Sequence, residues 1–141
     1  MREIKFRAYD NKLKKYVDTG EIIFSFYGDT RVQVMPNEIN YGQIADYEHD
    51  INNGRFIIEQ YTGLKDTNGV EIYEGDILNI LDPLKETPIQ NVVLFYYGCF
   101  SVCENGDPKN GTQTLLSIHC EGKTITVIGN IHEPQTQPNE K

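Results

Sequence analysis

Three carboxylates lie close together in the segment Gln60–Ile77, QYTGLKDTNGVEIYEGDI: Glu71, Glu74 and Asp76. Carboxylates at this spacing could bind a hard metal ion or act as general acid and base. The same residue types are common at chain reversals, where Asp accepts backbone N–H bonds. No histidine or cysteine lies beside them in the sequence. We therefore favour turn residues over a metal or catalytic cluster.

A second possible constellation comprises Cys99, Cys103 and His119. The spacing of the two cysteines is allowed for a zinc knuckle, but they lie in the apolar stretch YYGCFSVCE instead of on a turn. A Cys–His nucleophile pair would need a basic surrounding or a helix N-terminus to activate the thiol, and neither is evident. The odd number of cysteines argues against a disulfide framework. We predict buried free thiols, no metal and no cofactor, and leave open whether the three side chains meet.

Nucleotide-binding and hydrolase signatures are absent from the sequence: it contains no Walker loop, G-x-G-x-x-G, H-E-x-x-H or G-x-S-x-G motif. We therefore expect a protein that is not an enzyme.

The third candidate site is the basic start, REIKFRAYDNKLKKY. Proteins that bind single-stranded nucleic acid combine a positive groove with stacking aromatic rings, so Lys5, Arg7 and Tyr9 are candidate binding residues. The whole chain, however, has a net charge of -8 and a pI near 4.8, which disfavours a nucleic-acid partner. Lysines and arginines on an edge strand also protect it from aggregation. A nucleic-acid role for this strand is the less favoured interpretation.

Short strands are expected to position all of these residues, because apolar and polar side chains alternate along much of the chain. Gly98 is expected to bend the long apolar run that contains it. The predicted strands are EIKFRAY, EIIFSFYGD, RVQVM, RFIIEQY, DILNIL, NVVLFYYGCFSVC, TLLSIHC and TITVIGNI.

The composition agrees with a β-rich fold, since nine Tyr and six Phe suit pleated, half-buried surfaces. We predict a mainly β (β-rich α+β) fold, namely a small, strongly bent SH3-like barrel with a short helix or loop insertion. One domain is expected over residues 1–132. Residues 38–54 would form the irregular or helical insertion, and residues 133–141 a disordered tail.

Within Gln60–Ile77, glycines are expected at positions that require positive φ. Asn68 and Gly69 suit a tight hairpin turn, and Gly75 suits a second turn just before Asp76. Gly63 marks a third corner. If the segment has a binding surface, we expect it on the exposed edge that carries Glu71, Tyr73 and Asp76.

Three blocks of the sequence, REIKFRAYD, QYTGLKDTNGVEIYEGDIL and VIGNIHE, together resemble the YopX family of small proteins from bacteriophages and prophages of Gram-positive bacteria. The blocks occur in the family's order and span residues 2–133. At position 9 the family more often has Trp, and Tyr9 keeps an aromatic ring at this position. The resemblance implies a phage origin, action in the host cytoplasm and self-association, for example as a trimer. It implies no activity or catalytic residue.

The sequence has no apolar run long enough to cross a membrane and no signal-peptide pattern at its start, so we expect a location in the host cytoplasm and no membrane partner. The favoured function is that of a non-enzymatic accessory protein that binds an unidentified host or phage protein. Two alternatives stay open: binding of single-stranded nucleic acid through the basic strand, and sequestration of a small ligand by a tyrosine-lined oligomer.

Overall fold

The computed structural model describes residues 3–17, 19–25, 31–36 and 56–133, with the backbone alone for 19–25 and 31–36. The predicted insertion at 38–54 and residues 134–141 of the predicted tail lie outside the described residues. The chain divides into two compact units, Ile4–Gln60 and Tyr61–Lys141 with Met1–Glu3. We refer to them as the N-terminal and C-terminal units. The single domain over 1–132 stays a prediction.

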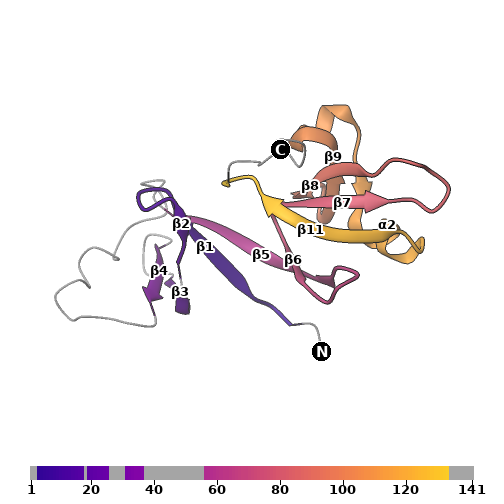
Figure 1. Ribbon diagram of the computed structural model, residues 1–141. Coiled ribbons are helices and arrows are strands. Elements are labelled where there is room, and N and C mark those ends of the chain that lie inside the picture. Colours follow the sequence, from indigo (N-terminus) through magenta and orange to yellow (C-terminus); the bar gives the residue numbers. More distant parts are fainter. Residues whose placement is uncertain (1–2, 18, 26–30, 37–55, 134–141) are drawn as a thin grey trace, which may run out of the picture. The chain divides into compact units, whose positions relative to one another are not determined.

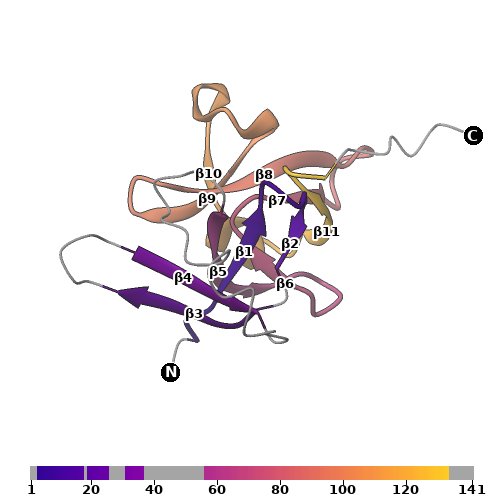
Figure 2. The ribbon, with the colours of Figure 1, turned by 90° about the vertical axis from the view of Figure 1, so that its left-hand side faces the viewer.

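The N-terminal unit is built from antiparallel strands. Strand β1 pairs on one side with β2 and on the other with the first half of β5, where Arg7 lies opposite Glu59. Strands β3 and β4 form a separate two-stranded ribbon (Figure 2). The strands are β1 (Phe6–Asp10), β2 (Lys15–Tyr16), β3 (Thr19–Ser25), β4 (Arg31–Pro36) and β5 (Phe56–Lys65).

The C-terminal unit contains a five-stranded antiparallel sheet in the order β10-β9-β8-β7-β11. Figure 1 labels β7, β8, β9 and β11 of this sheet. The second half of β5 pairs with β6. The elements after β5 are β6 (Glu71–Tyr73), β7 (Asp76–Leu81), β8 (Ile89–Tyr96), β9 (Cys99–Cys103), the 3-10 turns η3 (Glu104–Gly106) and η4 (Pro108–Asn110), β10 (Gln113–Thr114), α2 (Leu115–Cys120) and β11 (Thr124–Asn130).

The core of the C-terminal unit follows from strand alternation. In β7, Asp76, Leu78 and Ile80 are buried while the residues between them are half-buried, as expected for a strand with one face on a core. The cluster comprises Ile72, Leu78, Ile80, Val93, Val102, Leu115, Ile118 and Ile125. The predicted mainly β class is confirmed: the sheet is a curled half-barrel, and the described residues include the short helix α2.

The predicted single bent strand in NVVLFYYGCFSVC is wrong. The chain forms two strands, β8 and β9, joined by a reversal at Tyr97 and Gly98, whose φ angles are 47° and 80°. Positive φ at both central residues is the requirement of the tight turn that joins two antiparallel strands. Gly98 therefore reverses the chain, and the two halves of the apolar run pair with each other.

The predicted strand in TLLSIHC is also wrong, since the segment forms the helix α2. Its two buried residues, Leu115 and Ile118, are three positions apart, which is a helical spacing. Thr114 caps the helix by accepting a hydrogen bond from the Ser117 N–H at 3.4 Å. In so short an apolar stretch, alternation alone does not separate strand from helix.

Among the described residues, no helix combines the length and the apolar character needed to cross a membrane.

Candidate functional site

The first turn of the segment Gln60–Ile77 is organised by one carboxylate. Oδ1 of Asp66 accepts hydrogen bonds from the backbone N–H groups of Asn68 (2.9 Å) and Val70 (2.8 Å). The Gly69 N–H donates to the Asp66 carbonyl at 3.0 Å, and Gly69 has a φ of 83°. Asp66 is only 7% exposed. Its carboxylate thus serves as a turn acceptor, in keeping with an Asx-type turn.

The same turn is fastened to the outer edge of β11. Oδ2 of Asp66 accepts a hydrogen bond from the Val127 N–H at 3.0 Å. Thr67 donates its N–H to the Ile125 carbonyl, and its Oγ1 accepts the Ile125 N–H, both at 2.9 Å. Strand β7 occupies the opposite edge of β11. The turn Asp66–Gly69 therefore covers an edge strand that would otherwise expose hydrogen-bonding groups.

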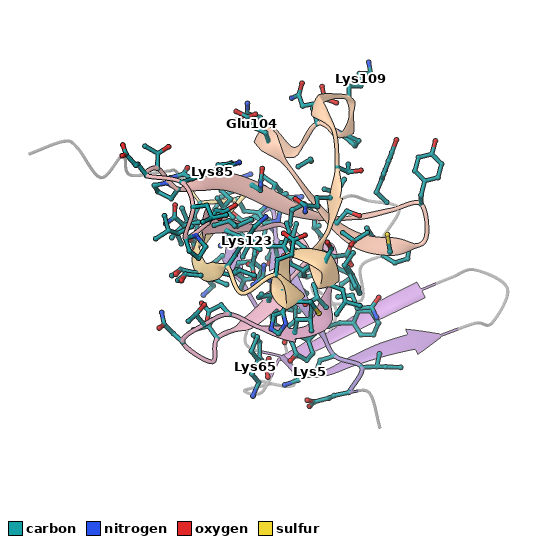
Figure 3. All side chains as sticks on the ribbon, turned by 90° about the vertical axis from the view of Figure 1, so that its right-hand side faces the viewer. Lys5, Lys65, Lys85, Glu104, Lys109 and Lys123 are labelled. Carbon is teal, nitrogen blue, oxygen red and sulfur yellow. The ribbon has the colours of Figure 1, made fainter. Side chains whose placement is uncertain are left out.

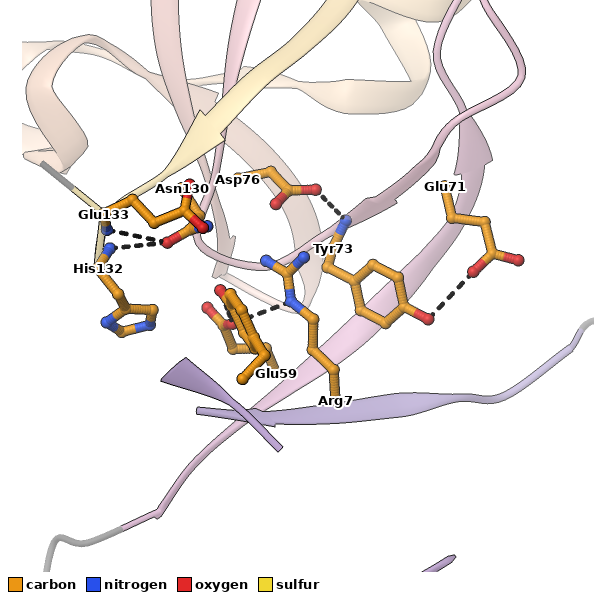
Figure 4. A network of polar contacts seen from close by, with 9 residues as sticks. Arg7, Glu59, Glu71, Tyr73, Asp76, Asn130, His132 and Glu133 are labelled. Atoms are coloured by element: carbon orange, nitrogen blue, oxygen red, sulfur yellow. Dashed lines mark hydrogen bonds and ion pairs between the residues drawn. The ribbon is translucent and has the colours of Figure 1, made fainter. Parts of the chain in front are cut away.

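The second turn, at Glu74 and Gly75, ties two further strands together. The Gly75 N–H donates to the carbonyl of Val93 in β8, and the Gly75 carbonyl accepts from the Ile131 N–H just after β11, both at 2.9 Å. Gly75 is buried and has a φ of 81°. Oδ2 of Asp76 accepts the Tyr73 N–H at 2.8 Å (Figure 4). This turn is therefore part of the sheet's hydrogen bonding.

The predicted exposed edge carrying Glu71, Tyr73 and Asp76 needs a correction, because Asp76 is 2% exposed. Its side chain shares the inward face of β7 with Leu78 and Ile80, which places it away from solvent. Glu71 and Tyr73 are half-buried and bonded to each other, with the Tyr73 hydroxyl 3.1 Å from the Glu71 carboxylate (Figure 4).

The expected corner at Thr62 and Gly63 is an irregularity within β5. The register with β6 shifts between Tyr61 and Lys65, and Gly63 has a φ of 84°. The Thr62 hydroxyl donates to the Ile72 carbonyl at 2.8 Å and accepts the Leu64 N–H at 3.2 Å. A β-bulge of this kind bends a strand without ending it.

Two of the candidate residues in the basic N-terminal strand contact groups of their own unit. Arg7 Nε lies 3.1 Å from Oε1 of Glu59 (Figure 4). The same oxygen accepts the Tyr16 hydroxyl at 2.7 Å. The guanidinium carbon of Arg7 lies 4.4 Å from the centre of the Tyr16 ring, a cation–π contact. Tyr9 is 5% exposed and packs edge-on against Tyr16 at 5.2 Å. Lys5 precedes β1 and is half-buried.

The three cysteines occupy different environments. Cys99 is half-buried, Cys103 is buried and Cys120 is exposed at the end of α2. Burial raises the pKa of the Cys103 thiol, the nearby charge of Asp107 raises it further, and the Gly106 N–H lowers it in part. Within the described part of the chain, no three His, Cys, Asp or Glu side chains are grouped so that they could hold a metal ion.

Two polar residues that carry much of this hydrogen bonding were not singled out from the sequence. Glu59 looks like an ordinary exposed position in an alternating strand, but it is buried and bonded to Arg7 and Tyr16 from the start of the chain. Asn130 Oδ1 accepts the N–H groups of His132 (2.9 Å) and Glu133 (3.2 Å). Asn at the end of a strand, followed by polar residues, is a recognisable signal for such a turn.

These observations define the class of protein: a small, mainly β protein in which two turns are hydrogen-bonded to strands of the five-stranded sheet. A sequence model of the family described as YopX protein matches residues 5–136. The chain belongs to the YopX family.

Two solved structures are similar to the chain. Protein EF1440 from Enterococcus faecalis is 24% identical, with a TM-score of 0.60 over 94% of this chain and 95% of that one. Protein yopX from Bacillus subtilis is 22% identical, with a TM-score of 0.61 over 94% of each chain. At these identities the likeness concerns the fold alone. No curated protein sequence matches the chain.

Proposed function

We propose that this YopX-family protein is a non-enzymatic accessory protein, encoded by a phage, that acts by binding another protein in the host cytoplasm. The observation that supports the proposal is the structural role of the buried carboxylates. Asp66, Asp76 and Glu59 are each less than a tenth exposed and accept hydrogen bonds that hold turns or strands together. Asp76, one of the three acids whose spacing suggested chemistry, thus has a structural role.

Exposed apolar side chains support a role in binding. Tyr97 is 89% exposed and Phe95 54%. Single exposed apolar residues are normal on protein surfaces, but a contiguous group marks a contact surface. Both residues lie at one end of the β8–β9 hairpin, where the Phe95 ring contacts the Phe100 ring and the Tyr97 ring contacts the Tyr96 ring.

The alternative of nucleic-acid binding through the basic strand receives less support. Arg7 is paired with Glu59 and stacked on Tyr16, and Tyr9 is buried. Stacking of bases requires accessible rings beside available positive charge. We therefore keep protein binding as the favoured function. The phage origin, the cytoplasmic location and self-association, for example as a trimer, rest on the family resemblance.

The test is an affinity purification from a lysate of a Gram-positive host, followed by reconstitution. We expect one dominant host or phage protein at near-stoichiometric yield. That protein, purified separately, should bind in isothermal titration calorimetry with a fixed ratio of subunits. Recovery of none from several hosts, or failure of each recovered protein to bind when purified, would contradict the proposal. Turnover of a substrate by the purified chain would contradict its non-enzymatic part.

A further inference from the structure

The end of the β8–β9 hairpin gathers four aromatic side chains, Phe95, Tyr96, Tyr97 and Phe100, which we call the aromatic hairpin end. The Phe95 and Phe100 rings lie opposite each other across the two strands, 5.2 Å apart. The Tyr96 and Tyr97 rings are 4.4 Å apart. Two of the four side chains are largely exposed, Tyr97 at 89% and Phe95 at 54%.

Tyr97 occupies a backbone position that does not suit it. Both central residues of this turn have positive φ, 47° at Tyr97 and 80° at Gly98. Asn-Gly is the preferred pair there, because a large side chain is strained in the left-handed region. Burial cannot compensate for that strain, since most of the ring is in solvent. A strained and exposed residue of this kind suggests a function outside the fold.

The hairpin end also extends past its neighbouring strands. Strand β7 pairs with β8 only as far as Ile77 opposite Val92, with one further bond from Gly75 to Val93. Strand β10 pairs with β9 only at Val102 and Ser101. Among the described strands, none pairs with the hairpin beyond these points. Phe95, Tyr96 and Tyr97 therefore lie on a part of the hairpin that has no further described strand beside it, whereas Phe100 packs against the core cluster.

The net charge of the C-terminal unit points to the kind of partner. The stretch Pro88–Cys103 has no charged side chain, whereas residues 61–133 contain ten Asp or Glu, four Lys and no Arg. Figure 3 shows Lys85, Glu104 and Lys109 on the loops that flank this stretch in the sequence. A partner thus meets neutral aromatic rings on a unit with excess negative charge, which favours the approach of a positively charged segment.

We propose that the aromatic hairpin end docks an arginine-containing basic segment of the partner protein. Guanidinium groups stack on the faces of Tyr and Phe rings, and arginine does so more readily than lysine. The chain itself contains such a contact, with the guanidinium carbon of Arg7 4.4 Å from the centre of the Tyr16 ring. The inference rests on the proposed function, because it names the chemistry of the protein partner.

Two variants and one control test the docking surface with a fluorescein-labelled peptide that alternates Arg with Gly and Ser. We expect the wild-type protein to bind it in fluorescence anisotropy. Tyr97→Asn and Phe95→Ser should each weaken binding about two- to fivefold, the range of an exposed cation–π contact. Leu84→Ser, at an equally exposed apolar residue in another loop, should leave binding unchanged. No binding by the wild type, or equal binding by all four proteins, would overturn the inference.

The folding stability of the Tyr97→Asn variant separates docking from packing. Because Asn tolerates the left-handed region, this variant should have a higher urea midpoint than the wild type while it binds more weakly. A lower midpoint would mean that the ring supports the fold, and would overturn the inference. Equal binding of a peptide with Lys in place of Arg by the wild type would also overturn the inference. The same holds if the Tyr97→Asn variant loses self-association in sedimentation experiments or loses binding to an oligonucleotide.

The same variants distinguish this inference from the proposed function. In affinity purification from host lysate, Tyr97→Asn should recover less of the partner than Leu84→Ser. If both recover it equally, protein binding stands and the docking site is refuted. If the wild type and the variants all recover no partner, the proposed function is contradicted. The docking site is then contradicted as well, unless the arginine peptide binds as predicted.

Discussion

Asp66 illustrates how one side chain can hold a turn and a strand edge together. Its two carboxylate oxygens accept three backbone N–H groups, from Asn68, Val70 and Val127. Backbone donors that lose their partner in a buried site cost free energy, typically about 1–3 kcal/mol each when water cannot replace the acceptor. The residue is therefore required by the fold, whatever the protein binds.

We expect Asp66→Ala to lower the free energy of unfolding by about 2–4 kcal/mol, since part of the lost hydrogen bonding is taken over by water. Asp66→Asn keeps one acceptor oxygen and should cost less. Urea denaturation followed by circular dichroism measures the difference. Asp82→Ala is the matched control, because the Asp82 carboxylate accepts one backbone N–H, from Leu84, in an exposed loop. A loss in Asp66→Ala no greater than in Asp82→Ala would contradict this role.

The Cys103 thiol gives a second prediction at the scale of the residue. Its pKa is raised above the ordinary value of 9.0, chiefly by burial, so at pH 8 it should be the slowest cysteine to react with iodoacetamide, and exposed Cys120 the fastest. Peptide mass spectrometry measures the order, with urea-unfolded protein as the control in which the three rates converge. Faster modification of Cys103 than of Cys120 in the folded protein would contradict it.

The same pKa shift affects stability at high pH. A thiol with a raised pKa binds its proton more tightly in the folded state, so its contribution is complete below pH 9.0 and is lost as the pH rises through the folded-state pKa. Replacement of Cys103 by Ala should therefore flatten the loss of stability above pH 9.0, as measured by urea midpoints. An unchanged pH dependence would show that other groups cause it.

At the scale of the element, strands with a clear alternation were predictable from sequence. DILNIL and TITVIGNI form β7 and β11, because every second side chain must face one core. The turn signals at Gly69 and Gly75 were readable for a similar reason, since positive φ restricts the residue type. Both kinds of signal are local, and each depends on few neighbouring residues.

Contacts between distant segments were not predictable from one sequence. No local pattern in Asp66 or Thr67 indicates that they hydrogen-bond to Val127 and Ile125, about sixty residues away. The reversal at Tyr97 was missed because tyrosine is a poor residue for that turn. The burial of Glu59 likewise depends on a strand from the start of the chain. Pairing between distant strands therefore determines which of these residues are buried or hydrogen-bonded, where local sequence preference does not.

The helix α2 supplies a prediction at this scale. Ile118 is 2% exposed in the core cluster, whereas neighbouring Leu116 is 60% exposed. Ile118→Ala should lower the free energy of unfolding by about 2–5 kcal/mol, as buried large-to-small changes do, and Leu116→Ala by about 0.5 kcal/mol or less. Urea midpoints compare the two. Similar losses in both variants would contradict the helical arrangement.

At the scale of the whole molecule, two sequence blocks that resemble the family meet in the C-terminal unit. QYTGLKDTNGVEIYEGDIL contributes Asp66, Thr67 and Gly75, and the segment that ends in VIGNIHE contributes the strand edge and Ile131 that they hydrogen-bond. Asp76 and Asn130 also lie opposite each other in the ladder of β7 and β11. The blocks therefore form one structural unit, and the central segment that stood out in the sequence is explained by folding.

Amide hydrogen exchange by NMR tests whether the turn Asp66–Gly69 covers the edge of β11, because protection reports the local opening of each hydrogen bond. The Val127 amide is held by Asp66 and the Ile125 amide by Thr67. Asp66→Ala should speed exchange at Val127 more than at Ile125, and Thr67→Val should do the reverse. If both amides keep their wild-type protection in both variants, the turn does not cover β11 and the claim is wrong.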